Sequence, residues 1–296
     1  MWASRLLPPL WWDFLTYGRR GITTVTRGRF RRWLGTEGQW AVRNPAEFTG
    51  SKVTIDGIHV YIDPRLSDRM VRRIVTGIHT RPERRLVLSA LEPDDVVMEL
   101  GAGVGMVSIA CAKRIGSERV FAYEANPDLQ SMFKENCRLN GVAPRLEICL
   151  LGRTHGEATF HLARDFSNSS VHRSRLVDRA VTVPIRPFDD EIARIRPSFL
   201  IVDIEGAEDE LFACARLDTI SKMMLEVHPH IYGAAKSNAL RSKIRASGFT
   251  EQTSNGRHCL YRRPGRQAGR GDETMPALRR ARAGDANAPA DHSRPM

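Results

Sequence analysis

The sequence lacks a cysteine pattern that would organise a fold or bind zinc. It has five cysteines in 296 residues, an odd number, and no two of them stand in C-x-x-C spacing. This argues against a disulfide framework and against a zinc site. Several cysteines stand within apolar runs, where a free cysteine packs as a small hydrophobic residue. We therefore expect a reducing, cytoplasmic compartment.

Long hydrophobic runs are also missing. No stretch approaches the ~20 apolar residues that a transmembrane helix needs. The first 20 residues contain Trp2, Trp11 and Trp12, but prolines and Asp13 interrupt the apolar run. They lack the small-residue cleavage site of a secretory signal. We expect an arm that packs on the domain or on a partner subunit, which leaves a dimer open; weak contact with a membrane surface is the alternative.

The sequence has little net charge away from its ends. The formal net charge is +11, but residues 1–35 hold seven Arg against one Asp, and residues 262–296 hold eight Arg against four acidic residues. The residues between them therefore carry a net charge of only +1. Nucleic-acid enzymes usually carry a basic face on the folded domain itself. A nucleic-acid partner is therefore not expected, and the basic ends are interpreted as solvated segments.

Four segments follow from composition and pattern. Residues 1–35 form the basic arm, and residues 36–92 an accessory element with two strands around Asp56-Gly57, a favoured hairpin turn, and two helices over 66–78 and 82–91. Residues 93–263 form the main domain. Residues 264–296 are rich in Gly, Pro, Arg and Ala, so we expect a disordered tail.

The main domain alternates between short apolar runs and helical segments. The runs VVMEL, RVFAYE, RLEICLL, SFLIVDIEG and KMMLEVHP read as buried strands, and HCLYRR as a final strand. Helices are expected over 104–115, 127–140 and 240–247. Alternation of this kind predicts an α/β fold with a doubly wound, Rossmann-like sheet and helices on both faces.

A glycine turn, ELGAGVG, follows the first of these strands and opens a helix, the context that a nucleotide-binding turn requires. Its spacing is G-x-G-x-G, which departs from the dinucleotide fingerprint G-x-G-x-x-G. Glu99 would repel a pyrophosphate but suits a cationic group such as the amino group of a methionine moiety. A plain structural glycine turn is the less favoured alternative. Its candidate cofactor-binding residues are Glu99, Gly101, Ala102, Gly103 and Gly105.

Glu124 ends the second strand of the main domain. A carboxylate there can accept hydrogen bonds from both ribose hydroxyls of an adenosine moiety. This fits NAD and S-adenosylmethionine equally well. Ala125 and Asn126, which follow Glu124, complete the candidate cofactor-binding set.

Two pairs of polar residues follow later strands. Asp203 and Glu205 end the run SFLIVDIEG, and the two-residue period of a strand directs them to one side. They are suited to orienting a substrate hydroxyl, taking its proton or holding a divalent cation, although no metal is assigned. Glu226 and His228 end the next strand in the same way, and His228 is either a general base or a structural hydrogen-bonding residue.

Taken together, ELGAGVG, YEANP, VDIEGAE and LEVH resemble the FkbM-type methyltransferases over residues 94–230. The resemblance implies a seven-stranded methyltransferase sheet and S-adenosylmethionine as cofactor, with methylation of a hydroxyl on a sugar, glycan or natural product. It implies that Glu99, Gly101, Gly103 and Glu124 bind cofactor, and that Asp203, Glu205 and His228 face the substrate as catalytic residues. A polar insert of that family adds the substrate-facing residues Asn168, Ser169 and Ser170. The strand that ends in LEVH adds Glu226.

Two other functions remain as alternatives. An RNA methyltransferase would use the basic ends, but adenine-N6 enzymes carry an Asn/Asp-Pro-Pro-aromatic stretch where this chain has DIEG. An NAD-dependent oxidoreductase is disfavoured by the glycine spacing and by Glu99. The predicted partner is a small-molecule or glycan acceptor.

Overall fold

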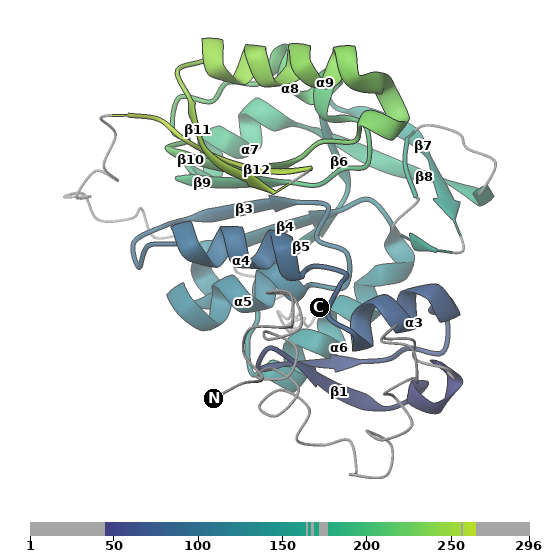
Figure 1. Ribbon diagram of the computed structural model, residues 1–296. Helices are drawn as coiled ribbons and strands as arrows, with labels where there is room; N and C mark the ends of the chain where they lie inside the picture. Colours follow the sequence, from purple (N-terminus) through teal and green to yellow (C-terminus); the bar gives the residue numbers. More distant parts are fainter. Residues whose placement is uncertain (1–44, 164, 167–168, 172–176, 256, 265–296) are drawn as a thin grey trace, which may run out of the picture.

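The computed structural model describes residues 45–163, 165–166, 169–171, 177–255 and 257–264. The predicted basic arm lies outside these residues, as does the predicted tail apart from Pro264. Figure 1 shows a central sheet with helices on both faces. A smaller hairpin element lies beneath the lower layer of helices.

The accessory element begins with a 3-10 turn, η2 (Pro45–Phe48), and the predicted hairpin of β1 (Lys52–Ile55) and β2 (Ile58–Tyr61). Asp56 and Gly57 at its tip have φ of 52° and 78°, the left-handed backbone that a two-residue turn between twisted strands requires. Two helices follow, α3 (Asp68–Val75) and α4 (Arg81–Ala90). The first helix is shorter than predicted at both ends, since Ser67 caps its start and Gly77, with φ of 72°, follows its end.

The main sheet has seven strands in the order β11-β12-β10-β9-β3-β4-β5. All neighbours are parallel except β12, which runs antiparallel to both β10 and β11. The order reverses between β3 and β9, which places the ligand-binding crevice of an open α/β sheet at their carboxyl ends. The strands are β3 (Val97–Leu100), β4 (Val120–Glu124), β5 (Arg145–Ile148), β9 (Phe199–Val202), β10 (Lys222–Glu226), β11 (Thr250–Asn255) and β12 (His258–Arg262).

Helices cover the two faces of this sheet in separate groups. In Figure 1, α4, α5 and α6 lie below the sheet, while α7, α8 and α9 lie above it. Apolar side chains of β3, β9 and β10 alternate between the two layers, so one buried cluster contains Val97, Phe199 and Met224 and the other Met98, Leu200 and Met223. The doubly wound α/β prediction is confirmed. The remaining elements of the sheet's surroundings are α5 (Met106–Ile115), η3 (Ser117–Arg119), η4 (Pro127–Leu129), α6 (Gln130–Asn140), α7 (Phe188–Ile195), α8 (Glu208–Cys214) and α9 (Pro229–Ala246).

A second, three-stranded sheet stands beside the crevice. It is built from β6 (Leu150–Gly152), β7 (Gly156–Ala163) and β8 (Val177–Pro187), in the order β6-β8-β7. The run RLEICLL, predicted as one strand, is divided at Cys149 between this sheet and the main one, because the Cys149 amide donates to the Glu124 carbonyl at 3.0 Å while β6 turns to pair with β8. The helix predicted over 240–247 is the second part of the longer α9, which is kinked at Gly233 (φ 85°).

Candidate functional site

The main cavity of the described residues lies at the carboxyl ends of β3, β4 and β9, where the strand order reverses. It encloses about 1020 Å³, including space open to solvent. Its floor is the glycine turn after β3, and its walls are the start of β6, Phe160 of β7, the segment after β9, and the connection between α3 and α4. Loops from distant parts of the chain therefore converge at the place where α/β sheets bind nucleotides.

The glycine turn requires glycine for two different reasons. Gly101 has a φ of 86°, and a Cβ there would stand 1.7 Å from the Asp203 carbonyl oxygen. Gly101 is thus needed for the close approach of two backbone segments. Gly103, with φ of 55°, faces space, since its nearest side-chain atom would be Phe166 Cε2 at 3.6 Å. The turn thereby leaves open backbone on the cavity side, which a ligand can approach.

Glu124 closes over this turn from the end of β4. Its Oε2 accepts a hydrogen bond from the Gly103 amide at 2.8 Å, and its Oε1 accepts one from the Asn126 amide at 2.7 Å. Burial raises the pKa of Glu124, and these N–H donors oppose the rise. Each carboxylate oxygen retains lone-pair capacity. Glu124 is therefore held in place and able to accept two neighbouring ribose hydroxyls.

Glu99 stands at the bottom of the cavity, on β3. It is 2% exposed and accepts a short hydrogen bond from the Ser108 hydroxyl of α5. Burial raises its pKa to about 8, although the Ser108 hydrogen bond lowers it. A cationic ligand group at this position would favour the charged carboxylate.

The predicted cofactor-binding residues divide into two groups. Ala102 and Ala125 line the cavity with the residues already described. Gly105 and Asn126 do not belong to its lining. A Cβ on Gly105 would stand 2.8 Å from Phe133, and the Asn126 side chain caps η4 by accepting from the Asp128 amide at 3.0 Å. These two residues shape the turns that carry the lining.

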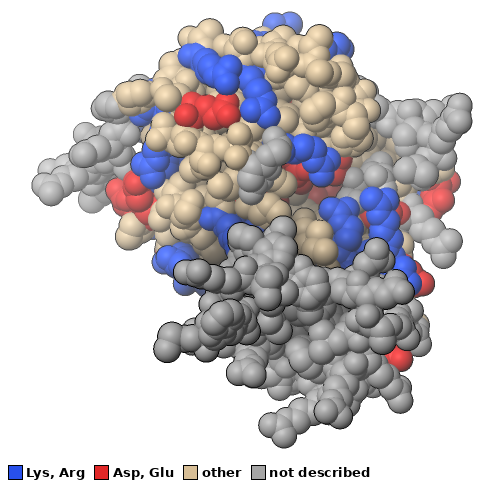
Figure 2. Space-filling view, in the orientation of Figure 1, with Lys and Arg blue, Asp and Glu red and all other residues tan. Residues whose placement is uncertain are grey.

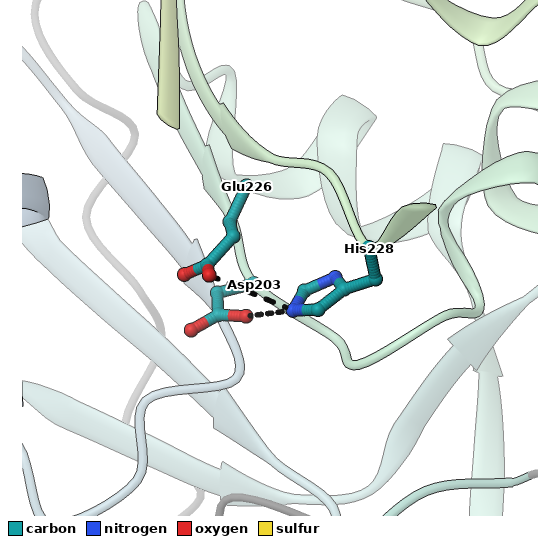
Figure 3. A group of neighbouring side chains, drawn as sticks. All are labelled: Asp203, Glu226 and His228. Atoms are coloured by element: carbon teal, nitrogen blue, oxygen red, sulfur yellow. Dashed lines mark ion pairs between the residues drawn. The ribbon is translucent and has the colours of Figure 1, made fainter. Parts of the chain in front are cut away.

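The predicted catalytic residues meet on one side of the cavity. The His228 Nε2 atom lies 3.5 Å from Asp203 Oδ1, 3.2 Å from Glu205 Oε2 and 3.8 Å from Glu226 Oε1. Figure 3 shows Asp203 and Glu226 directed toward this nitrogen from the ends of adjacent strands. Asp203 and Glu205 line the cavity, whereas His228 is 0% exposed and stands behind them with Glu226.

The electrostatic setting of this cluster is dominated by carboxylates. Burial raises the pKa of Asp203 well above its usual range, and burial also raises the pKa of Glu205, to about 7. Glu226 is the exception. Its pKa falls to about 2 because the hydrogen bond from His258, at 3.0 Å, and nearby positive charges outweigh burial. The pKa of His228 rises, since hydrogen bonding to Glu208 and nearby carboxylates outweigh burial.

Three residues that the sequence interpretation did not assign belong to this site. Glu208 is fully buried, and its Oε1 lies 2.8 Å from His228 Nδ1. Its position inside VDIEGAE was the available signal. Glu83 of α4 and His79 line the cavity from the accessory element. Burial lowers the pKa of His79 to about 3, so its ring is neutral, and it meets Phe166 edge to face with ring centroids 5.4 Å apart.

The polar insert is only partly described. Ser169 lines the cavity, and the Ser170 hydroxyl donates to the Glu205 carbonyl at 2.8 Å, which ties the insert to the segment after β9. Asn168 lies outside the described residues. The roles of all these residues stay predictions.

Comparison with known proteins identifies the chemistry of the domain. Residues 50–155 match the family model of the TRM5/TYW2 methyltransferase domain. The chain is 34% identical over 90 residues to a ribosomal protein L11 methyltransferase of Geobacter metallireducens, covering 29% of this chain and 30% of that protein. It is 26% identical over 119 residues to the tRNA (guanine(37)-N(1))-methyltransferase Trm5b of Methanocaldococcus jannaschii, covering 38% and 32%.

Solved structures give weaker similarity. A tRNA m1G37 methyltransferase of M. jannaschii has a TM-score of 0.36 and 15% identity, covering 71% of this chain and 54% of the other. A precorrin-6y C5,15-methyltransferase of Geobacter metallireducens has a TM-score of 0.38 and 14% identity, covering 60% and 84%. Among the curated relatives named above, the matched segment spans less than a third of their length.

These matches confirm a methyltransferase-type domain with S-adenosylmethionine as cofactor. They correct the FkbM resemblance, because the family model that matches is that of TRM5/TYW2. The accessory hairpin, which the resemblance left out, lies inside the matched residues. The glycine turn and Glu124 were interpreted as cofactor-binding residues, and such residues carry no information about the acceptor, which explains the error.

The predicted partner, a small-molecule or glycan acceptor, is also wrong. A small-molecule or glycan acceptor was expected and a nucleic acid was not, whereas the relatives are named for tRNA and for a ribosomal protein. Methylation of a hydroxyl oxygen has no support from these names. Separately, no described helix has both the length and the apolar character needed to cross a membrane.

Proposed function

We propose that the chain is an S-adenosylmethionine-dependent methyltransferase that methylates a ring nitrogen of an RNA base. The observation that carries the proposal is the meeting of two groups in one cavity: the glycine turn with Glu124, and the carboxylates of Asp203 and Glu205 in the segment after β9. The TRM5/TYW2 match over residues 50–155 supports RNA as the acceptor class.

The part of the cavity around the glycine turn, Glu99 and Glu124 would bind both the adenosine and the methionine moieties of the cofactor. Glu124 would accept the ribose hydroxyls, and Ala125, Leu129 and Leu150 supply apolar surface beside it. Glu99 would bind the amino group at the methionine end. The cofactor, when bound, supplies an electrophilic methyl group on a sulfonium. The protein holds that group against an acceptor, and alignment of this kind supplies much of the rate in group transfer.

The part of the cavity lined by His79 and Phe166 suits a planar base. His79 and Phe166 line it with a neutral imidazole and an aromatic ring, surfaces on which an unstacked base can pack. Asp203 and Glu205 would accept hydrogen bonds from N–H groups on the edge of that base. A carboxylate acceptor favours an N–H edge over a phosphate, which it would repel.

Removal of the nitrogen-bound proton is assigned to Glu205. About a quarter of its side chain is exposed to the cavity, whereas His228 is fully buried and has no access to an acceptor. A carboxylate within reach of the proton can accept it as the methyl group transfers. His228 would act on Glu205 and Asp203 from behind, as a positioning residue.

The test is transfer of a radioactive methyl group to macromolecules. The purified full-length chain would be incubated with labelled S-adenosylmethionine and unmodified tRNA, with ribosomal RNA and ribosomal proteins as parallel acceptors. We expect label in RNA, located by nuclease digestion to a methylated base nitrogen. Glu205→Gln should lower turnover ~10²- to 10⁴-fold while S-adenosylhomocysteine binding is retained. Label in neither RNA nor protein, with bound cofactor, would refute the proposal.

A protein acceptor is the second candidate. It is favoured by the 34% identity over 90 residues to a ribosomal protein L11 methyltransferase. Label confined to ribosomal protein in the same experiment would select it. In either case we expect the enzyme to act in the cytoplasm, where both acceptors are made.

The charge on the described surface is compatible with both acceptors. Figure 2 shows Lys and Arg interspersed with Asp and Glu on one face, rather than gathered into a single patch. An RNA acceptor would therefore be recognised at the cavity and through the basic ends of the sequence.

A further inference from the structure

The cluster of side chains that follow β9 and β10 contains two buried polar atoms that face each other without a hydrogen bond. They are His228 Nε2 and Asp203 Oδ1, which lie 3.5 Å apart. The His228 side chain is 0% exposed, and its Nε2 is directed toward Asp203 (Figure 3). His228 Nε2 also lies 3.2 Å from Glu205 Oε2 but makes no hydrogen bond there. A buried polar atom without a hydrogen bond costs free energy, which indicates that a partner of another kind binds it.

The other nitrogen of the same ring is already used. Glu208, also fully buried, lies with Oε1 2.8 Å from His228 Nδ1. A carboxylate that accepts from Nδ1–H fixes the tautomer in which Nε2 carries a lone pair. This carboxylate–histidine arrangement is the one that surrounds metal-binding histidines in proteins.

The spacing of the surrounding oxygens fits a single ion. Asp203, Glu226 and His228 each offer a ligand atom, and these atoms all lie within 4.8 Å of one another. Ligands at about 2.1 Å from a shared cation are themselves separated by about 3.0–3.4 Å. The distances from His228 Nε2 to Asp203 and Glu226, 3.5 and 3.8 Å, need only a slight contraction.

The charge of the cluster also favours a cation. Asp203, Glu205, Glu208 and Glu226 surround His228, while Arg257 and His258 both contact Glu226 at 3.0 Å. His230 packs against His228 with ring centroids 5.7 Å apart. Asp203 and Glu205 form their ion pairs with His228, on the side of the cluster away from Arg257 and His258.

We propose that Asp203, Glu226 and His228 bind one divalent transition-metal cation, such as Mn²⁺ or Zn²⁺, with Glu208 orienting His228. One imidazole and two carboxylates suit these ions better than Mg²⁺, which prefers oxygen ligands alone. Asp203 lines the cavity, so the cation would face the acceptor and could polarise it. The inference deepens the proposed function, because it adds a cation to the same site.

The test measures metal binding without acceptor or turnover, so its outcome is independent of methyl transfer. The full-length chain would be stripped with chelator, dialysed and titrated with Mn²⁺ followed by electron paramagnetic resonance. Parallel titrations would use Co²⁺, followed by visible absorbance, and Zn²⁺, followed by calorimetry. We expect one bound equivalent and a Co²⁺ spectrum of a site with nitrogen and oxygen ligands.

Variants identify the ligands. Asp203→Asn and His228→Gln should each lower metal affinity at least tenfold, and Glu208→Gln about 10- to 100-fold as a residue that orients a ligand. Glu157→Gln, on an exposed position of β7, is the matched carboxylate-to-amide control and should bind as the wild type does. Circular dichroism and thermal unfolding check each variant. Asp203→Asn, at a partly exposed position, is the informative variant if His228→Gln does not fold.

Two results would overturn the proposal. One is the absence of bound Mn²⁺, Co²⁺ and Zn²⁺ above the level set by nonspecific sites. The other is binding that Asp203→Asn and Glu208→Gln leave unchanged. In the first case His228 is itself the cation of the cluster, protonated between Glu208 and Glu205.

Discussion

Gly101 lies where the ends of β3 and β9 come closest. Its amide donates to the Tyr123 carbonyl at 2.9 Å, and the Asp203 amide donates to the Leu100 carbonyl at 2.9 Å, so both segments are fixed. A methyl group added at Gly101 would overlap the Asp203 carbonyl oxygen. Gly101→Ala must therefore displace the glycine turn or Asp203. We expect it to lower the free energy of unfolding by more than ~3 kcal/mol and to abolish S-adenosylhomocysteine binding.

Gly233 provides the matched control. Its φ is 85°, against 86° for Gly101, but a Cβ there would have no atom within 4 Å. Gly233→Ala should therefore cost only the backbone strain of a position with φ 85° and ψ 160°, a region that essentially only glycine adopts, ~1–3 kcal/mol. Thermal unfolding and calorimetric titration with S-adenosylhomocysteine measure both variants. Equal losses in the two variants would show that the contact with Asp203 is unimportant.

Glu99 gives a prediction for pH. Its pKa of about 8 means that the free protein holds this carboxyl protonated at neutral pH, and a cationic amino group bound beside it favours the ionised form. Binding then releases a proton, so S-adenosylhomocysteine affinity should rise as pH increases from 6 to 8, by up to about tenfold per unit, and level off above 8. Glu99→Gln should bind more weakly at pH 8 with a flatter profile. Isothermal titration in buffers of different ionisation enthalpy counts the protons, and a flat wild-type profile would contradict the assignment.

The sequence predicted that Asp203 and Glu205 lie on one side, but it predicted the wrong backbone geometry for them. Asp203 and Glu205 do meet at His228, but the strand ends at Val202 and Glu205 has a φ of 48°. A turn, rather than the two-residue period of a strand, brings Glu205 back to the cluster. Glu208 and Glu83 were missed because burial at the cavity depends on tertiary packing that no local pattern encodes.

The docking of the hairpin depends on two asparagines of α6. Asn136 is fully buried and accepts from the Tyr61 amide at 2.8 Å while donating to the Val104 carbonyl at 2.9 Å. Asn140 accepts from the His59 amide at 3.0 Å and donates to its carbonyl at 2.6 Å. The two side chains bind backbone groups of β2, as a neighbouring strand would. They connect the accessory element to the helix behind the glycine turn.

Asn136→Ala would leave two buried backbone groups without partners. At ~1–3 kcal/mol for each unsatisfied group, we expect a loss of ~2–5 kcal/mol in the free energy of unfolding. Cofactor affinity should also fall, because Val104 belongs to the glycine turn. Asn238→Ala, at an exposed position of α9, should change stability by less than ~0.5 kcal/mol. Urea unfolding monitored by circular dichroism compares them, and similar midpoints for the two variants would contradict the docking role.

Elements with a strong pattern were predicted and weak ones were not. The apolar runs of β3, β9 and β10 identified buried parallel strands, and Asp56-Gly57 identified the hairpin. By contrast, β11 reads TEQTSN and has no large apolar residue, since it lies at the edge of the sheet. The helices α7 and α8 have eight and seven residues, too few turns for a helical period to stand out against the polar background.

The charge of the whole sequence is concentrated at its two ends, but the conclusion drawn from this about a nucleic-acid partner was wrong. A net charge of +1 between residues 36 and 261 was taken to disfavour a nucleic-acid partner, but a net sum hides an acidic cavity that offsets basic residues elsewhere. Asp203, Glu205, Glu208 and Glu226 alone place four carboxylates in one cluster. The rest of the domain is correspondingly more basic than its total suggests. Recognition of RNA would then depend on local charge and on the ends of the chain.

If the basic N-terminal segment contacts RNA, binding should weaken as the salt concentration rises. Each arginine that neutralises a phosphate contributes about 0.7–0.9 to the slope of log affinity against log salt concentration. Residues 1–35 hold seven arginines against one aspartate. Replacing Arg19, Arg20, Arg31 and Arg32 with Gln in the full chain should therefore weaken tRNA binding uniformly and reduce the slope by up to about 3. S-adenosylhomocysteine affinity should not change, because the cavity of the described residues keeps its lining.

Filter binding between 50 and 200 mM salt measures the slope, with the exposed pair Lys236→Gln and Lys243→Gln on α9 as the control for loss of surface charge. An unchanged slope in the arginine variant would show that the N-terminal charge does not contact RNA, and would leave the cavity as the site that selects the acceptor.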